Sequence, residues 1–142
     1  MVEVKPTMLR KLALMFLTLA FSFSAYAEDP PPADYVNYIE LKPILTNYGN
    51  GPRIHFVKAE MTIQVSTPDA HHAVNFHKPQ IRHKLVFLLS DQSVEEMESV
   101  EAQATIAKEA LRLVQDVLIK EEGEAFVSDL FFTSFITQGA SS

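Results

Sequence analysis

Cysteine is absent from the 142-residue sequence, and glycine occurs only four times. Without thiols the chain cannot form disulfide bonds or carry thiol redox chemistry. A phosphate-binding loop needs several closely spaced glycines, and no such cluster is present. The folded part must therefore be stabilised by its hydrophobic core alone, which the 47% content of hydrophobic residues allows.

Long hydrophobic runs are also scarce, and the longest one lies near the N-terminus. It covers residues 12–27, whereas a membrane-spanning helix needs about 20 apolar residues. Basic residues precede the run, and it ends on Ala25-Tyr26-Ala27, the small-x-small pattern that signal peptidase cleaves. We therefore predict that residues 1–27 are a signal peptide cleaved after Ala27, with a short uncleaved membrane anchor as the alternative. Both place the rest of the chain outside the cytoplasm, because the basic flank stays inside.

The remaining chain is predicted to form one small exported domain behind a spacer. Residues 28–34 contain three consecutive prolines, which favour an extended conformation. The domain then occupies residues 35–138, and residues 139–142 form a flexible tail. Removing the first 27 residues takes away three basic residues and one acidic residue, so the net charge changes from −6 to −8. An acidic domain repels phosphate backbones, so nucleic acid is excluded as a partner.

Two segments near the start of the domain have the composition of strands. Residues 35–48 are rich in aromatic and β-branched residues, and Pro43 predicts a strand that lies at an edge or is interrupted there. Residues 53–65 alternate strictly and should form an antiparallel hairpin with the first segment. Thr67-Pro68-Asp69 is expected to be the turn that ends this strand. One face of the second strand should be buried, with Val57, Ala59, Met61, Ile63 and Val65 on it.

The next segment, residues 70–89, is expected to divide at Pro79. The part before Pro79 is weakly helical, and the part after it has a proline well placed to begin a helix. The run "VFLL" within the second part is too short for periodicity alone to decide between a helix and a strand.

A long helix is predicted to begin at Ser93 and to continue to Lys120. Ser93 and Glu96 match a capping box, and Gly123 is the expected stop. A terminal strand follows over residues 126–137. The sequence thus predicts an α+β fold, in which one long amphipathic helix and shorter helices pack on an antiparallel sheet. The apolar stripe of the helix should be core, with a partner surface as the alternative, and it consists of Val100, Ala104, Ala107, Leu111, Val114 and Leu118.

No residue pattern predicts an enzyme or a metal site. The spacing of the four clustered histidines (His71, His72, His77 and His83) matches no zinc motif, so they are expected to be solvated. The glutamates gather at the two ends of the predicted helix, where charged side chains normally face water. The serines have no histidine or aspartate at motif spacing. We therefore expect no catalytic residue, no cofactor and no metal.

Several ordered motifs together resemble one known family. They are Tyr38-Ile39-Glu40-Leu41-Lys42-Pro43, the strand over residues 53–65, Pro79-Gln80-Ile81-Arg82, the glutamate-rich helix and the closing Phe132-Thr133-Ser134-Phe135-Ile136-Thr137-Gln138. In this order they resemble the flagellar basal-body-associated FliL family over about residues 35–138. The chain departs from the family pattern at His83 and at Glu101-Ala102-Gln103, and its N-terminal run is shorter than the usual spanning helix.

The resemblance implies a domain similar to the stomatin/prohibitin type, on the periplasmic face of the inner membrane. Family members are not enzymes; they support motility by assembling as homo-oligomeric rings beside the stator of the flagellar motor. A soluble periplasmic ligand- or protein-binding module of the same fold, without a motor role, is the alternative function.

The terminal strand is the expected interaction surface. It carries more aromatic side chains than one small core obviously needs, so it is the strongest candidate for such a surface, although a core strand is the interpretation that the composition favours. Phe132 and Phe135 are three residues apart and would point to opposite faces of a regular strand. We therefore expect one of them to pack in the core and the other to contact a protein partner.

Overall fold

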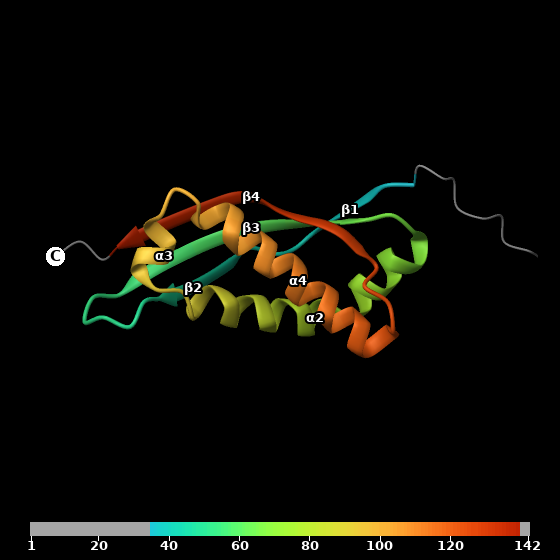
Figure 1. The fold of residues 1–142 in the computed structure, drawn as a ribbon, viewed down its shortest axis with the longest axis horizontal. Coiled ribbons are helices and arrows are strands. Elements are labelled where there is room, and N and C mark those ends of the chain that lie inside the picture. Colours follow the sequence, from blue (N-terminus) through green and yellow to red (C-terminus); the bar gives the residue numbers. More distant parts are fainter. Residues whose placement is uncertain (1–34, 140–142) are drawn as a thin grey trace, which may run out of the picture. The chain divides into compact units, whose positions relative to one another are not determined.

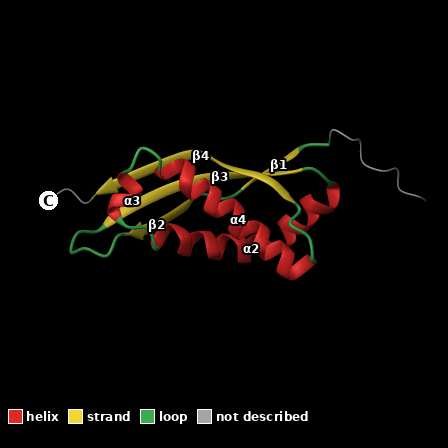
Figure 2. Ribbon diagram, viewed as in Figure 1, coloured by secondary structure: helices red, strands yellow, loops and turns green. Residues whose placement is uncertain are grey.

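The computed structural model describes residues 35–139, which form a four-stranded antiparallel sheet and three helices (Figures 1 and 2). The predicted signal peptide or anchor, its cleavage after Ala27 and the spacer lie outside the described residues. The elements in chain order are β1 (Asn37–Glu40), β2 (Ile44–Tyr48), β3 (His55–Val65), α2 (Pro68–Ser90), α3 (Val94–Glu98), α4 (Ala102–Glu122) and β4 (Val127–Gly139). The α+β prediction with an antiparallel sheet is confirmed.

The sheet is built around β3, which pairs with all three other strands. β4 pairs along the whole of β3. β1 and β2 pair with successive parts of β3, since Asn37 lies opposite Val65 and Ile44 lies opposite Ala59. The alternation predicted for β3 is confirmed, because all five of its predicted inward residues are buried. Of the expected outward residues, only Thr62 is also buried.

The interruption between β1 and β2 falls at Pro43, as the sequence predicts. Proline has no N–H to donate to a neighbouring strand. The guanidinium of Arg82 on α2 donates hydrogen bonds to the carbonyl oxygens of Lys42 and Pro43, the latter at 2.8 Å. One planar guanidinium thus satisfies two carbonyls that the broken strand leaves without strand partners.

We expect Arg82→Ala to lower the free energy of unfolding by about 1–3 kcal/mol, because hydrogen bonds to a charged donor are lost and the carbonyls keep only solvent as partner. Arg82→Lys should recover only part of this loss, since a single ammonium nitrogen lacks the two separate, fixed nitrogens with which the guanidinium reaches both carbonyls. Urea denaturation of the three proteins measures both values. Equal stability of the alanine variant and the parent would contradict this role.

The predicted division of residues 70–89 at Pro79 is wrong. α2 is one helix that runs through Pro79, and Thr67 caps it by accepting a hydrogen bond from the N–H of Ala70 (3.1 Å). Thr67-Pro68-Asp69 is therefore the start of this helix and not only the end of a strand. An internal proline costs about 3 kcal/mol. Burial of a Val, Leu or Ile side chain contributes about 1.5–3 kcal/mol each, and four such residues on both sides of Pro79 are buried, so packing outweighs that cost. They are Val74, Ile81, Leu85 and Leu89.

The single long helix predicted from Ser93 to Lys120 is divided into α3 and α4. The capping box of Ser93 and Glu96 is present, and Gly123 ends α4 in the left-handed conformation, as expected. Ser99 is extended and ends α3. Met97 and Ala102 are both buried, although five residues of a continuous helix would turn them about 140° apart. The break lets both side chains reach the core.

The break also shifts the buried stripe of α4 away from the predicted positions. Val100 and Ala104 are exposed, and Leu111 is only half-buried. Val114 and Leu118 are buried, as predicted. The complete buried stripe is Ala102, Ile106, Ala110, Val114, Val117 and Leu118.

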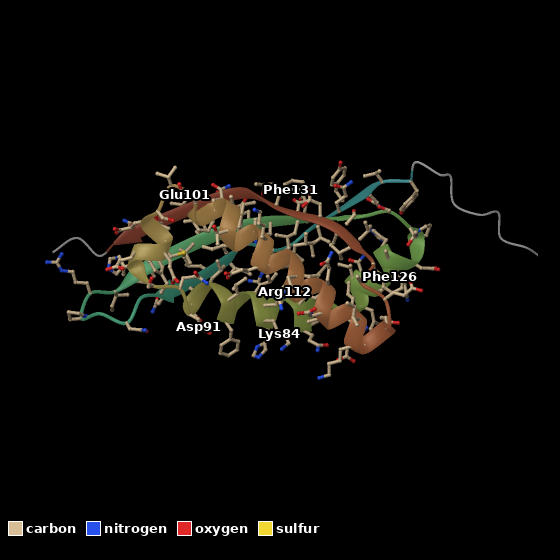
Figure 3. All side chains as sticks on the ribbon, in the orientation of Figure 1. Lys84, Asp91, Glu101, Arg112, Phe126 and Phe131 are labelled. Atoms are coloured by element: carbon tan, nitrogen blue, oxygen red, sulfur yellow. The ribbon has the colours of Figure 1, made fainter. Side chains whose placement is uncertain are left out.

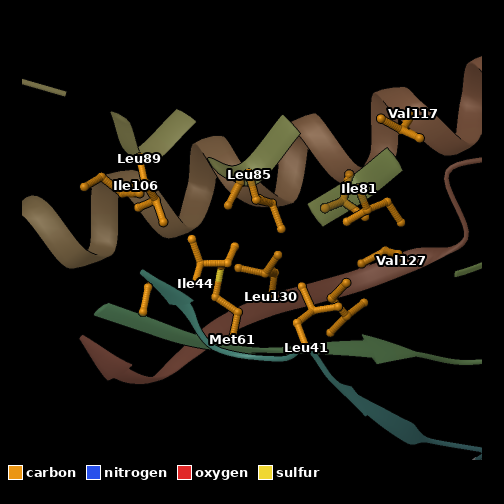
Figure 4. Close-up of a cluster of buried hydrophobic side chains, with 14 of the residues drawn as sticks. Leu41, Ile44, Met61, Ile81, Leu85, Leu89, Ile106, Val117, Val127 and Leu130 are labelled. Atoms are coloured by element: carbon orange, nitrogen blue, oxygen red, sulfur yellow. The ribbon is translucent and has the colours of Figure 1, made fainter. Parts of the chain in front are cut away.

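The core lies between one face of the sheet and the two long helices (Figure 4). Side chains of α2 such as Ile81 and Leu85 face Met61 and Leu130 of the sheet in this view. Gln115 of α4 also donates a hydrogen bond to the carbonyl oxygen of Val127 (3.0 Å), which fixes the start of β4. The other face of the sheet has no helix over it among the described residues.

Candidate interaction surface

Phe132 and Phe135 lie on one face of β4, and the prediction that they point to opposite faces is wrong. The register of β4 shifts at Thr133, because Phe132 lies opposite Met61 while Ser134 lies opposite Glu60. Such a β-bulge inserts one residue and changes the side-chain alternation. The two phenyl rings therefore meet edge to face, with their centroids 5.0 Å apart, and both are half-buried against the core.

The open face of the sheet carries a second group of apolar side chains. Alternate residues of each strand project from this face, because the intervening residues are buried under the helices. Tyr38 and Phe131 meet there edge to face at 6.2 Å. An ion pair between Lys58 and Glu60 (3.6 Å) interrupts the apolar surface. We define the open sheet face by its exposed apolar members: Tyr38, Leu45, Phe56, Phe131 and Ile136.

A groove runs between α2 and α4 on their outer side. Its apolar part includes Phe87 and Leu113, and its polar part carries charges of both signs. Figure 3 shows Lys84 on α2, Asp91 directly after the end of α2 and Arg112 on α4. The remaining lining residues are Gln80, His83, Leu88, Glu109, Asp116, Val117 and Lys120. The lining of the groove is therefore amphipathic, with charged side chains of both signs beside apolar ones.

The four clustered histidines do not converge. His71 lies beside the amide of Asn75, and His83 packs edge to face on Phe87, with the centroids 4.8 Å apart. His77 contacts the carboxylate of Glu122 at 2.6 Å, which joins α2 to the end of α4. Within residues 35–139 no group of three or more His, Cys, Asp or Glu side chains could hold a metal ion.

Two ionisable groups in the domain have shifted pKa values. The pKa of Glu96 is lowered, first by the backbone N–H of Ser93 and second by the Ser93 hydroxyl, which both bond to its carboxylate. The pKa of Tyr48 is raised chiefly by burial and further by the negative charge of Glu98, while a hydrogen bond with Thr137 opposes the rise. Both shifts arise from contacts within the fold, at the cap of α3 for Glu96 and at the end of β2 for Tyr48.

The Glu96 carboxylate gives a test of the cap by pH. A carboxyl group whose pKa is lowered in the folded state stabilises the fold above its unfolded pKa of about 4.3, and this contribution is lost as the pH falls through the folded pKa. Glu96→Gln keeps a capping side chain but cannot titrate. We expect the parent to lose more unfolding free energy than this variant between about pH 5 and pH 3. Parallel losses in urea denaturation at both pH values would contradict the cap's contribution.

Neither the hydrogen bonds of Arg82 to the Lys42 and Pro43 carbonyls nor the open sheet face was predicted from the sequence. Phe56, Lys58 and Glu60 are alternate residues of β3 and therefore lie on the same face. The alternation could thus have indicated one apolar residue, Phe56, on the outer face. Leu45 and Ile136 lie opposite Lys58 on either side. Their proximity depends on the pairing register, which no local pattern supplies.

Comparison with known proteins identifies the family. The family model described as "Flagellar basal body-associated protein FliL" matches residues 38–138. No curated protein matches the chain. Across residues 35–139 no helix is both long and apolar enough to cross a membrane. Because the matched region includes every strand and helix of the described domain except the first residue of β1 and the last of β4, the chain belongs to the flagellar basal-body-associated FliL family.

Proposed function

We propose that this protein is a non-enzymatic component of the flagellar motor, and that it supports motility by assembling with copies of itself beside the stator. The family match carries this proposal, since the FliL family is flagellar and basal-body-associated. The domain would lie on the periplasmic side of the inner membrane, and its fold would be of the stomatin/prohibitin type. The same family relationship supports the proposal that the copies assemble as a ring.

The distribution of exposed apolar groups supports a function through surfaces. A typical ligand site is a concave pocket with converging polar groups. Here the exposed apolar side chains of the sheet lie on one flat face, and Phe132 and Phe135 lie at its edge strand. Such patches are typical of protein–protein contacts. We propose that Phe132 and Phe135 contribute to the contact indirectly, because their packing against the core holds the edge strand β4 in place.

A soluble periplasmic binding module is the second candidate. The groove between α2 and α4 favours it, because apolar side chains there stand beside charges of both signs. A peptide or small polar ligand would fit such a lining, and no motor would be needed.

Localisation in cells separates the two functions. A fluorescent fusion that restores the parent's behaviour should form foci at flagellar bases, and the protein should co-purify with basal bodies or stator proteins. Arg112→Glu in the groove should leave the foci unchanged, since the groove is not the proposed contact. Diffuse periplasmic fluorescence with no enrichment at flagellar bases would overturn the motor proposal and favour the binding module.

A further inference from the structure

The outer edge of β4 is an unprotected strand edge. Within the described domain β4 pairs only with β3, so its other side presents unpaired N–H and C=O groups. Proteins usually protect such an edge with charged residues or proline. Residues 130–139 contain neither, and beyond the bulge at Thr133 the edge is regular over residues 134–139. This edge is therefore a template for another extended strand.

The opposite edge of the sheet is blunted. It consists of β1 and β2, which have four and five residues and are separated by Pro43. Arg82 also occupies the carbonyl groups at the interruption. The β1–β2 edge therefore offers few consecutive hydrogen bonds, and β4 is the better partner for another β4.

The pairing pattern indicates which backbone groups of β4 point outward. The N–H of Leu41 donates a hydrogen bond to the carbonyl oxygen of Met61 (3.0 Å). The backbone N–H and C=O of Met61 therefore point to the side of β3 on which β1 lies. Alternation then directs Glu60 toward its partner Ser134 on β4. Beyond the bulge at Thr133, the free edge is consequently formed by the N–H and C=O groups of every second residue. These residues are Phe135, Thr137 and Gly139.

We propose that two copies of the chain pair antiparallel through residues 134–139 of β4 and form one continuous sheet across a two-fold axis. The inference rests on the self-association in the proposed function, and it names a dimer contact that is distinct from the contact that would close a ring. Antiparallel pairing of identical strands is self-complementary, as a two-fold interface requires. The register centred on Thr137 uses all three outward residues, because Phe135 of each copy then lies opposite Gly139 of the other. A ring would need a second, different contact between such dimers.

Charge favours this site of contact. The described residues carry nine basic and fourteen acidic side chains, so two copies repel each other overall. The uncharged end of β4 is a place where like copies can meet without opposed carboxylates. Salt screens the remaining repulsion, so dimerisation should strengthen as ionic strength rises. An interface held by ion pairs would weaken instead.

Cysteine cross-linking provides the test, since the natural chain has no thiol that could interfere. The protein would be purified in the form that the cell produces and oxidised with oxidised glutathione. Thr137→Cys lies on the proposed axis and should form a disulfide-linked dimer at least about tenfold faster than Asn47→Cys on the blunted edge, because pairing raises the local thiol concentration. Asn47 is the matched control because it is also exposed and lies on a strand.

A measurement without cross-linking accompanies it. Sedimentation of the parent should show a monomer–dimer equilibrium that shifts toward the dimer between about 0.05 M and 0.5 M salt. Thr137→Pro removes the central donor and should remove the dimer while circular dichroism shows the fold retained. Equal cross-linking of the two cysteine variants, or a mixed disulfide between them as the main product, would overturn the two-fold pairing. If the two-fold pairing is overturned but a deletion strain loses motility, the proposed motor function is retained and only the dimer contact is rejected.

Discussion

Leu85→Ala is expected to lower the free energy of unfolding by about 2–5 kcal/mol. Leu85 is fully buried on α2, where it packs between the helices and the sheet (Figure 4). The substitution removes apolar contacts and leaves a cavity that a close-packed core cannot fill. The total stability of a small domain is about 5–15 kcal/mol, so this single change should remove a large share of it.

Urea denaturation followed by circular dichroism measures this loss. Val100→Ala is the control, because Val100 is 96% exposed in the turn before α4. It should cost no more than a few tenths of a kcal/mol. A large loss for Val100→Ala would contradict the break at Ser99, and a small loss for Leu85→Ala would contradict the packing of α2 against the sheet.

Phe132→Ala and Phe135→Ala are expected to destabilise the domain by similar amounts, about 1–3 kcal/mol each, because both rings are half-buried and touch each other. Full burial of a phenyl ring would make the loss about 3–5 kcal/mol. The edge-to-face pair should also give a coupling energy of about 0.5–1.5 kcal/mol, so the double variant should lose less than the sum of the single losses.

Thermal and urea melts of the two single variants and the double variant measure the coupling. Phe131→Ala is a matched control on the same strand, because Phe131 projects from the opposite face toward Tyr38. It should show no coupling to Phe135. Additive losses for Phe132 and Phe135, with one of them near zero, would instead support the opposite-face arrangement expected for a regular strand.

Local patterns predicted those elements whose structure depends on neighbouring residues. Strict alternation identified β3, Pro43 marked the interruption of the first strand, and Ser93 with Glu96 marked the start of a helix. Gly123 ends α4 because only glycine adopts its left-handed conformation (φ 85°) without strain. Each of these signals acts within a few residues, so it could be recognised in the sequence.

The incorrect predictions arose where distant contacts outweighed a local preference. Pro79 disfavours a helix locally, but buried residues on both sides of it hold α2 together. Met97 and Ala102 must both reach the core, which requires the break at Ser99. The bulge at Thr133 depends on the register between β3 and β4, and it brings Phe132 and Phe135 to the same face instead of to opposite faces. The sequence therefore predicted a strand that contains Phe132 and Phe135, but not the face on which these two side chains lie.

Motility of a strain that lacks this gene tests the motor function most directly. Swimming in soft agar samples low load, and swarming or swimming in viscous medium samples high load. We expect the deletion to reduce motility, most strongly at high load, and we expect the wild-type gene on a plasmid to restore it. A deletion strain that swims and swarms like its parent at both loads would contradict the account and leave the binding module in the periplasm as the better description of this protein.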